Sequence, residues 1–135
     1  MNTKEFIKSY IIILIVILLL DFIWLGYINK TNFGNQIYEI QSEKIEFIKV
    51  PAILTYLLMA FVITYLGNPV INKNIIDVIK YGIIIGLSMY GVYHGTNYSI
   101  FKKYKLSMVI TDTLWGCFLS TICLLSVHFF FNFAK

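Results

Sequence analysis

The chain has 135 residues, of which 59% are hydrophobic and 13% are charged, and its mean hydropathy is +0.76. Ordinary soluble domains are roughly half apolar and about a quarter charged, so this composition excludes a soluble globular domain. The net charge of +4 is the difference between 11 basic residues, all of them lysines, and 7 acidic ones. In a membrane protein, such lysines are typical of loops that face anionic lipid rather than of nucleic-acid binding. We therefore expect a multi-pass integral membrane protein, with the lipid bilayer as its partner and no nucleic acid.

Four apolar segments follow one another along the chain, each long enough or nearly long enough to cross a bilayer as a helix. They cover residues 9–28, 50–66, 76–98 and 106–131 of one predicted transmembrane domain, 1–135. Lys4 and Lys8 before the first segment resemble the front of a signal peptide. However, Asp21, Trp24 and Tyr27 stand where a small-residue cleavage site would be, so we predict that the first segment stays as a membrane helix.

The one long connection, residues 29–49, joins the first two segments. Its apolar residues recur at near-helical spacing among charged ones, at Phe33, Ile37, Ile40 and Ile48. This pattern predicts a short amphipathic helix on the membrane surface, and a solvated loop is the alternative interpretation. The predicted fold is therefore all-α, with four transmembrane helices and a short amphipathic surface helix between the first and the second.

An even number of crossings places both termini on one side of the membrane. The lysines on that side are Lys4, Lys8, Lys73, Lys80 and Lys135, against Lys30, Lys44, Lys49, Lys102, Lys103 and Lys105 on the other. These nearly equal sets do not decide the orientation by themselves. The basic flank before the first helix favours cytoplasmic termini.

Polar side chains interrupt three of the predicted membrane helices at similar depth, near the face of the long connection. They are Asp21, His94, Asn97 and Asp112. At 1.5 Å per residue, Asp21 lies roughly 10 Å below that face. A charged group at this depth costs several kcal/mol unless it faces the bundle interior and finds partners. We therefore expect these four residues to face a common interior space.

A short motif occurs in two helices that run in opposite directions. Asp21 precedes Trp24 by one turn and Asp112 precedes Trp115 in the same way, and a glycine follows each tryptophan. This similarity predicts an inverted pseudo-repeat around a shared site, with chance or packing as the alternative. The carboxyls then either bind a ligand or serve as structural acceptors for tryptophan, Asn97 or tyrosine hydroxyls.

The remaining residues of chemical interest have structural interpretations. Glycine pairs at 82/86 and 91/95 predict close helix approach on two faces of the third helix, which we therefore place at the centre. Cys117 and Cys123 are expected to be small buried side chains that cannot pair within one helix. His128 is expected at the membrane interface, and His94 is either functional or a satisfied interior histidine. Nothing has metal-ligand spacing with His94, so no metal or cofactor is predicted.

The motifs at 20–26, 90–97 and 111–116 together resemble a family of small predicted membrane proteins, domain of unknown function two-one-seven-seven. The resemblance covers nearly the whole chain in order and spacing. It implies four membrane helices and no established activity, although a lipid-related role stays open. The family commonly has an aspartate after the position of Tyr93, where this chain has His94 and Gly95. This departure implies a partly basic site and different handling of ions or protons.

The first functional hypothesis is a small transporter or channel-like protein for a cation or proton, acting as a homo-oligomer. Asp21 and Asp112 would bind the ligand, His94 would titrate near neutral pH, and Asn97 would orient ligand or water. Trp24, Tyr93 and Trp115 would support them. The alternatives are an intramembrane lipid-modifying enzyme or its partner, with His94 and an aspartate as acid and base, and a purely structural subunit.

Overall fold

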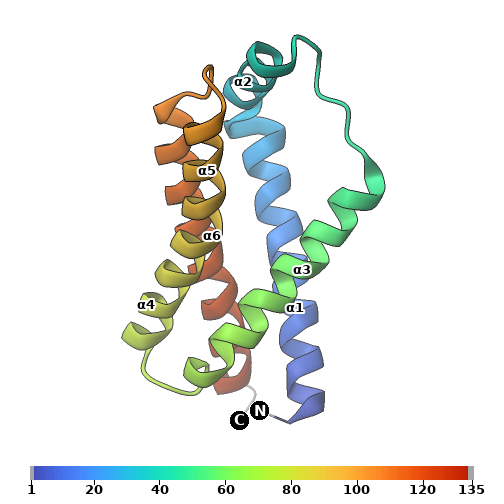
Figure 1. Cartoon of the computed structure of the whole chain (residues 1–135). Helices are drawn as coiled ribbons and strands as arrows, with labels where there is room; N and C mark the ends of the chain where they lie inside the picture. The colour runs from blue at the N-terminus through green and yellow to red at the C-terminus, as the bar shows by residue number, and fades with distance from the viewer. Residues whose placement is uncertain (1, 134–135) are drawn as a thin grey trace.

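The computed structural model, which describes residues 2–133, is an all-α bundle, as predicted (Figure 1). Its elements are α1 (Thr3–Ile23), a π-helical turn η1 (Trp24–Ile28), α2 (Lys30–Gln41), α3 (Lys49–Gly67), a 3-10 turn η2 (Asn68–Val70), α4 (Ile75–Gly86), a second π-helical turn η3 (Leu87–Gly91), α5 (Val92–Ile100) and α6 (Leu106–Phe133). Four stretches are long and apolar enough to span a membrane, namely Thr3–Ile28, Lys49–Val70, Ile75–Ile100 and Leu106–Phe133.

Local capping explains where the spans begin. α1 begins at Thr3, well before the predicted start at residue 9, because Asn2 and Glu5 form a capping box. The Asn2 side chain accepts from the Glu5 amide at 2.9 Å, and the Glu5 carboxylate accepts from the Asn2 amide at 3.0 Å. Pro51 lies in the first turn of α3, where its missing N–H costs nothing. Asn74 caps α4 by accepting from the amide of Asp77 at 2.9 Å.

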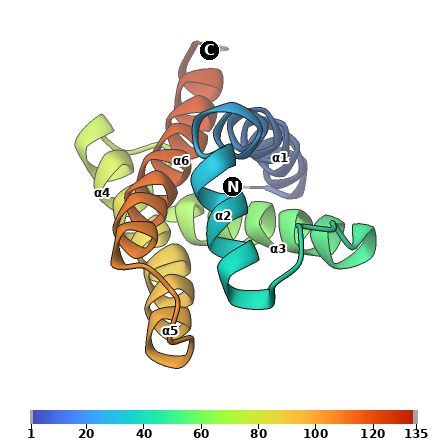
Figure 2. The same ribbon diagram turned by 90° about the horizontal axis from the view of Figure 1, so that it is seen from above.

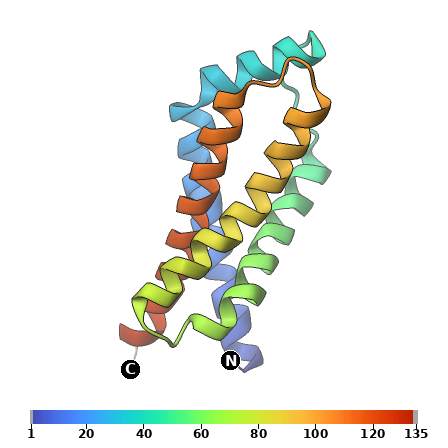
Figure 3. The same ribbon diagram turned by 60° about the vertical axis from the view of Figure 1, so that its left-hand side comes forward.

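The start of α1 and the end of α6 lie at one end of the bundle, and α2 crosses the other end (Figures 1 and 3). The half nearest the termini has a packed apolar core. Its fully buried side chains include Ile13, Ile17, Ile63, Leu124 and Val127. The buried polar side chains described in this half are the hydroxyls of Ser9, Thr64 and Ser120.

The fourth span occupies the centre of the bundle, which corrects the expectation that the third would. α6 contacts α1, α3, α4 and α5 and is the most buried span, and Figure 2 shows it between α4 and α1. The close approach predicted at Gly82 and Gly86 is present, since a Cβ at either would collide with the α6 backbone. The same expectation is wrong for Gly95, which has open space around it, and Gly91 meets mainly Leu87 of its own span.

The connection between the first two spans contains a helix, α2, over Lys30–Gln41. Ile48 was predicted to share its apolar face but lies beyond the helix, since Ser42 ends α2 with a positive φ of 62°. The buried Gln36 holds α2 in place. Its amide nitrogen donates to the Lys103 carbonyl, and its amide oxygen accepts from the Lys105 amide, both at 2.9 Å. The location of α2 on a membrane surface stays a prediction.

The side on which each loop lies can be tested by cysteine labelling. Lys135, one of the lysines counted on the terminal side, lies outside the described residues, whereas Thr3, Lys73 and Lys102 are exposed. In a background without the two free cysteines, a membrane-impermeant maleimide should reach Thr3→Cys and Lys73→Cys from one side and Lys102→Cys from the other. Reaction of Thr3→Cys and Lys102→Cys from the same side would contradict this topology. The same experiment on cells determines whether the termini are cytoplasmic.

Candidate binding site

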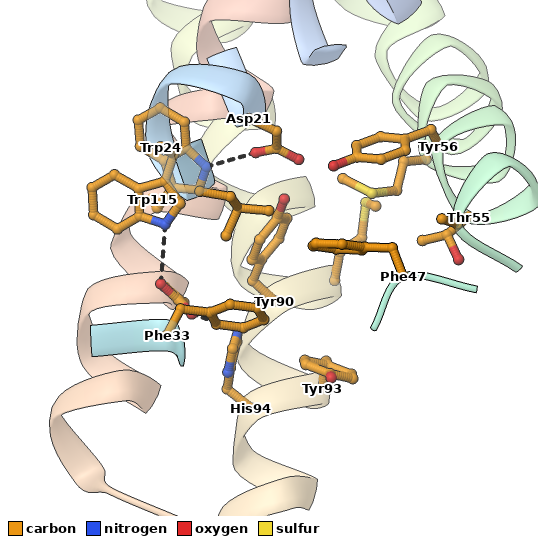
Figure 4. Close-up of a pocket in the computed structure, with 15 residues that line it drawn as sticks. Asp21, Trp24, Phe33, Phe47, Thr55, Tyr56, Tyr90, Tyr93, His94 and Trp115 are labelled. Carbon is orange, nitrogen blue, oxygen red and sulfur yellow. Dashed lines mark hydrogen bonds and ion pairs between the residues drawn. The ribbon is translucent and has the colours of Figure 1, made fainter. Parts of the chain in front are cut away.

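A cavity of about 400 Å³ lies within the half of the bundle near α2 and receives side chains from all four spans. Most of the residues predicted to form the site line it: Asp21, Trp24, Tyr93, His94, Asp112 and Trp115. Asn97 does not, which corrects the expectation that it faces the same space as the aspartates. Figure 4 shows the two tryptophan rings on one side of the cavity and Tyr56 and Phe47 on the other.

The two Asp-Trp motifs exchange hydrogen bonds. The indole N–H of Trp115 donates to Asp21 at 2.9 Å, and that of Trp24 donates to Asp112 at 3.2 Å. The indole rings stack between them, with centroids 4.5 Å apart and planes 5° apart. Each aspartate is therefore held by the tryptophan of the opposite-running helix, which is the arrangement expected of an inverted pseudo-repeat.

The glycines that follow the tryptophans do not share this symmetry. A Cβ on Gly116 would collide with the ring of Tyr90, so this glycine makes room for an aromatic side chain at the site. Gly26 has nothing within 4 Å of its Cβ position. The pseudo-symmetry therefore extends to the carboxyls and the indoles only.

Asp112 is at the end of a chain of polar side chains. Besides Trp24, the buried Asn29 donates to its Oδ1 at 3.0 Å, and His94 Nε2 lies 3.7 Å from its Oδ2. The other nitrogen of His94, Nδ1, is 2.6 Å from the hydroxyl of Tyr104. This series of polar side chains extends from inside the third and fourth spans to the loop between α5 and α6.

Tyr104 links His94 to the loop between α5 and α6. Burial raises the pKa of its hydroxyl, although a hydrogen bond with Asn97 opposes the rise, so the group keeps its proton near neutral pH. A protonated hydroxyl can donate to Nδ1 of His94 or accept a hydrogen from it, so the tautomer of His94 decides which ring nitrogen carries the hydrogen. Asn97 thus contributes through Tyr104 rather than by lining the cavity.

Asp21 has tyrosines as neighbours. The hydroxyl of Tyr56 from α3 forms a hydrogen bond with its carboxyl, and the ring of Tyr90 lies between the two sides of the cavity (Figure 4). The sequence analysis expected tyrosine hydroxyls as possible partners of the carboxyls but did not identify Tyr56, Tyr90, Tyr104 or Asn29. The signal for Asn29 was its position directly after an apolar span, where a polar residue reads as the start of a loop.

The site carboxylates have no fixed positive partner. The chain contains no arginine, and no lysine lines the cavity among the described residues. Lys105 forms its ion pair with Glu39, outside the bundle, at 2.7 Å. His94 is the one basic group near either aspartate in the described chain. No group of three or more His, Cys, Asp or Glu side chains within residues 2–133 has the arrangement of a metal site.

The fold and the site define a four-span helical membrane protein with a buried carboxylate pair at a partly open cavity. The chain belongs to the family described as predicted membrane protein (DUF2177), whose sequence profile matches residues 6–128. This match confirms the family resemblance found in the motifs. Comparison with curated proteins and with solved structures gave no match.

The raised pKa of Tyr104 predicts a pH dependence of stability. Its contribution is fully present below the ordinary tyrosine value of about 10 and is lost as the pH rises through the higher value of the folded protein. Tyr104→Phe should lower the free energy of unfolding by about 1 kcal/mol at neutral pH and flatten its decline in alkali. Thermal unfolding in detergent measures both effects, with the exposed Tyr98→Phe as control. A decline as steep as that of the wild type would contradict the assignment.

Proposed function

We propose that this protein is a small membrane transporter that binds a cation or a proton at Asp21 and Asp112. The observation that supports this most is the pair of carboxylates, 6% and 4% exposed, on a cavity without a lysine. An ionised carboxylate in a bilayer costs several kcal/mol, even in a bundle interior, unless its charge is balanced. The indole and amide N–H groups that donate to the carboxylates orient them but do not neutralise their negative charge. A bound proton or cation neutralises it.

His94 can balance at most one of the two carboxylates. Its Nε2 is 3.7 Å from Asp112, and its other nitrogen is bonded to Tyr104. The path Tyr104, His94, Asp112 can pass a proton between the loop that follows α5 and the cavity. In this proposal Asp112 exchanges protons through His94, while Asp21, held by Trp115 and Tyr56, takes part in ligand binding.

The packed core on the terminal side favours a transporter over an open channel. Beyond the cavity, Ile17, Ile63 and Leu119 are fully buried, and the buried polar groups described beside them are the small hydroxyls of Thr64 and Ser120. A bound ion therefore reaches the opposite face only if the helices rearrange or a second copy contributes. The two π-helical turns, which carry Trp24 and Tyr90, are the segments we assign to such a rearrangement. A homo-oligomer, expected from the sequence, is part of this proposal.

The enzyme alternative has less support from the cavity. His94 and Asp112 provide an acid and a base, but neither serine nor cysteine lines the cavity in the described chain, and the hydroxyl of Thr55, which does, donates to the Pro51 carbonyl at 2.9 Å. A purely structural subunit would use the carboxylates only as acceptors. These alternatives share the expectation that the protein moves no ion.

Ion flux in proteoliposomes separates these functions. Purified protein in vesicles with an internal pH indicator should take up protons, or exchange them for sodium or potassium, faster than empty vesicles. The double variant Asp21→Asn/Asp112→Asn should reduce the flux to the level of empty vesicles. Wild-type vesicles that behave like empty ones under both pH and ion gradients would contradict a transport function.

A further inference from the structure

We propose that the ligand of this site is a hydrophobic organic cation, in which one positive charge is attached to an aromatic or aliphatic body. This inference rests on the proposed function, because it names the substrate class of the same cavity. Three properties of the cavity support it: its volume, its walls of aromatic rings and carboxylates, and the side on which its surrounding helices diverge.

The cavity is much larger than an inorganic ion requires. Its volume of about 400 Å³ lies within the range of roughly 300–1,000 Å³ that is typical of small-molecule sites. A dehydrated inorganic ion instead needs a compact shell of several oxygen ligands, and the carboxylates among the described lining residues are Asp21 and Asp112. The space therefore fits a molecule with several rings or branches.

The walls combine aromatic rings with negative charge. The stacked indoles of Trp24 and Trp115 stand opposite Tyr56 and Phe47, and Asp21 lies beside them (Figure 4). Aromatic faces attract organic cations, most strongly where water is excluded, and burial of an apolar body adds to this attraction. A neutral apolar ligand would leave the carboxylates unbalanced, and an anion would be repelled by them. A hydrophobic cation packs against the aromatic rings and balances the charge of the carboxylates.

The helices around the cavity diverge between α3 and α5. α3 packs closely on α1, α4 and α6 but not on α5, and Figure 2 shows α3 and α5 leaving the centre in different directions. The first turns of α3 are exposed, with Val50 67% and Leu54 60% accessible, while Thr55 and Tyr56 line the cavity. In a membrane this gap faces lipid. A hydrophobic cation dissolved in the bilayer thus enters sideways, between α3 and α5.

Such a cation is either a free solute or the quaternary ammonium of a lipid headgroup. Both share the chemistry that the cavity recognises. A phosphocholine headgroup also brings a phosphate within a few bonds of the ammonium, and this phosphate would approach Asp21 and Asp112. The free cation is therefore the better match.

Binding of tetraphenylphosphonium to the purified protein in a neutral detergent tests the inference. The chain has only two tryptophans, and both line the cavity, so intrinsic tryptophan fluorescence reports on this site alone. Tetraphenylborate is the matched control, because it has nearly the same shape and the opposite charge. We expect a saturable fluorescence change with tetraphenylphosphonium and an affinity at least about tenfold weaker for tetraphenylborate. Equal affinities, or no saturable response to the cation, would overturn the inference.

Variants identify the residues responsible. Asp21→Asn/Asp112→Asn should weaken tetraphenylphosphonium binding at least about tenfold, and Asp77→Asn, at the start of α4, should leave it unchanged. Near-ultraviolet circular dichroism of the stacked indoles shows whether the double variant keeps its site. The comparison of tetraphenylphosphonium with tetraphenylborate uses the wild type and therefore does not depend on the folding of a variant. Unchanged cation binding in a folded double variant would overturn the inference.

The outcomes distinguish this inference from the proposed function. Proton or sodium flux without tetraphenylphosphonium binding would overturn the substrate class and leave the transporter. Tetraphenylphosphonium binding without any flux, including flux of that cation, would support the site and overturn transport. Competition by dodecylphosphocholine would identify a lipid headgroup as the source of the cation, and its absence would support a free solute.

Discussion

Asp112→Asn is expected to abolish cation or proton flux while the bundle stays folded. Asparagine preserves the shape of the side chain and an oxygen that accepts from Trp24 and Asn29, which both donate to the same carboxylate oxygen, Oδ1. It has no charge to balance a cation and takes up no proton. Flux in proteoliposomes should therefore fall to the level of empty vesicles, and the free energy of unfolding should change by no more than about 1 kcal/mol.

Asp112→Leu separates this functional role from a structural one. Leucine leaves the indole N–H of Trp24 and the amide of Asn29 without an acceptor, and each buried donor without a partner costs about 1–3 kcal/mol. The leucine variant should therefore lose a few kcal/mol of stability as well as its activity. The control, Asp77→Asn, should keep both. If Asp112→Asn and Asp21→Asn were each fully active with unchanged stability, the aspartates would have no part in the mechanism.

Gly86→Ala is expected to destabilise the protein by at least about 2 kcal/mol. A Cβ at this position would collide with the carbonyl oxygen of Gly116 and the backbone of Cys117, so α4 has to move away from α6 as a whole. Backbone atoms cannot rotate aside as a flexible side chain does. The same displacement shifts Tyr90, one π-helical turn later, out of its place over Gly116. Unfolding in mixed micelles of a mild detergent and sodium dodecyl sulfate, followed by circular dichroism, measures the loss.

Gly95→Ala is the matched control for this variant. It lies in the same span and belongs to the same predicted set of helix-packing glycines, but nothing lies within 4 Å of its Cβ position. Alanine should leave the stability unchanged or raise it by up to about 1 kcal/mol, because it favours the helix more than glycine does. Equal losses in the two variants would show that α4 and α6 do not pack as described.

The helices could be predicted because their signal is local. An apolar run long enough to cross a bilayer has to form a helix, since lipid offers no partner for the backbone. Burial of Asp21 and Asp112 was predictable for a similar reason, because a charged side chain in a span has to face inward. Tryptophan was among the donors expected for these carboxyls, but the structure was needed to show that Trp115 donates to Asp21 and Trp24 to Asp112.

The predictions that were wrong, and the site residues that were missed, depend on contacts between segments that are distant in the sequence. Gly91 and Gly95 have the spacing of a packing face, but whether a helix packs there depends on where α3 lies. Asn97 has the right depth, yet its rotation around α5 brings it to Tyr104 instead of the cavity. The sequence indicates a loop residue at Asn29. It belongs to the site because it lies between η1 and α2, where its side chain donates to Asp112.

Infrared difference spectroscopy shows whether Asp21 and Asp112 take up a proton or a cation in the folded protein. Spectra of the protein in lipid are recorded at acidic and alkaline pH, and the carbonyl stretch of protonated carboxyls is compared between the wild type and Asp21→Asn/Asp112→Asn. We expect carboxyl bands in the wild type that are absent from the double variant and that decrease when tetraphenylphosphonium is added. Identical difference spectra for the two proteins would contradict this expectation.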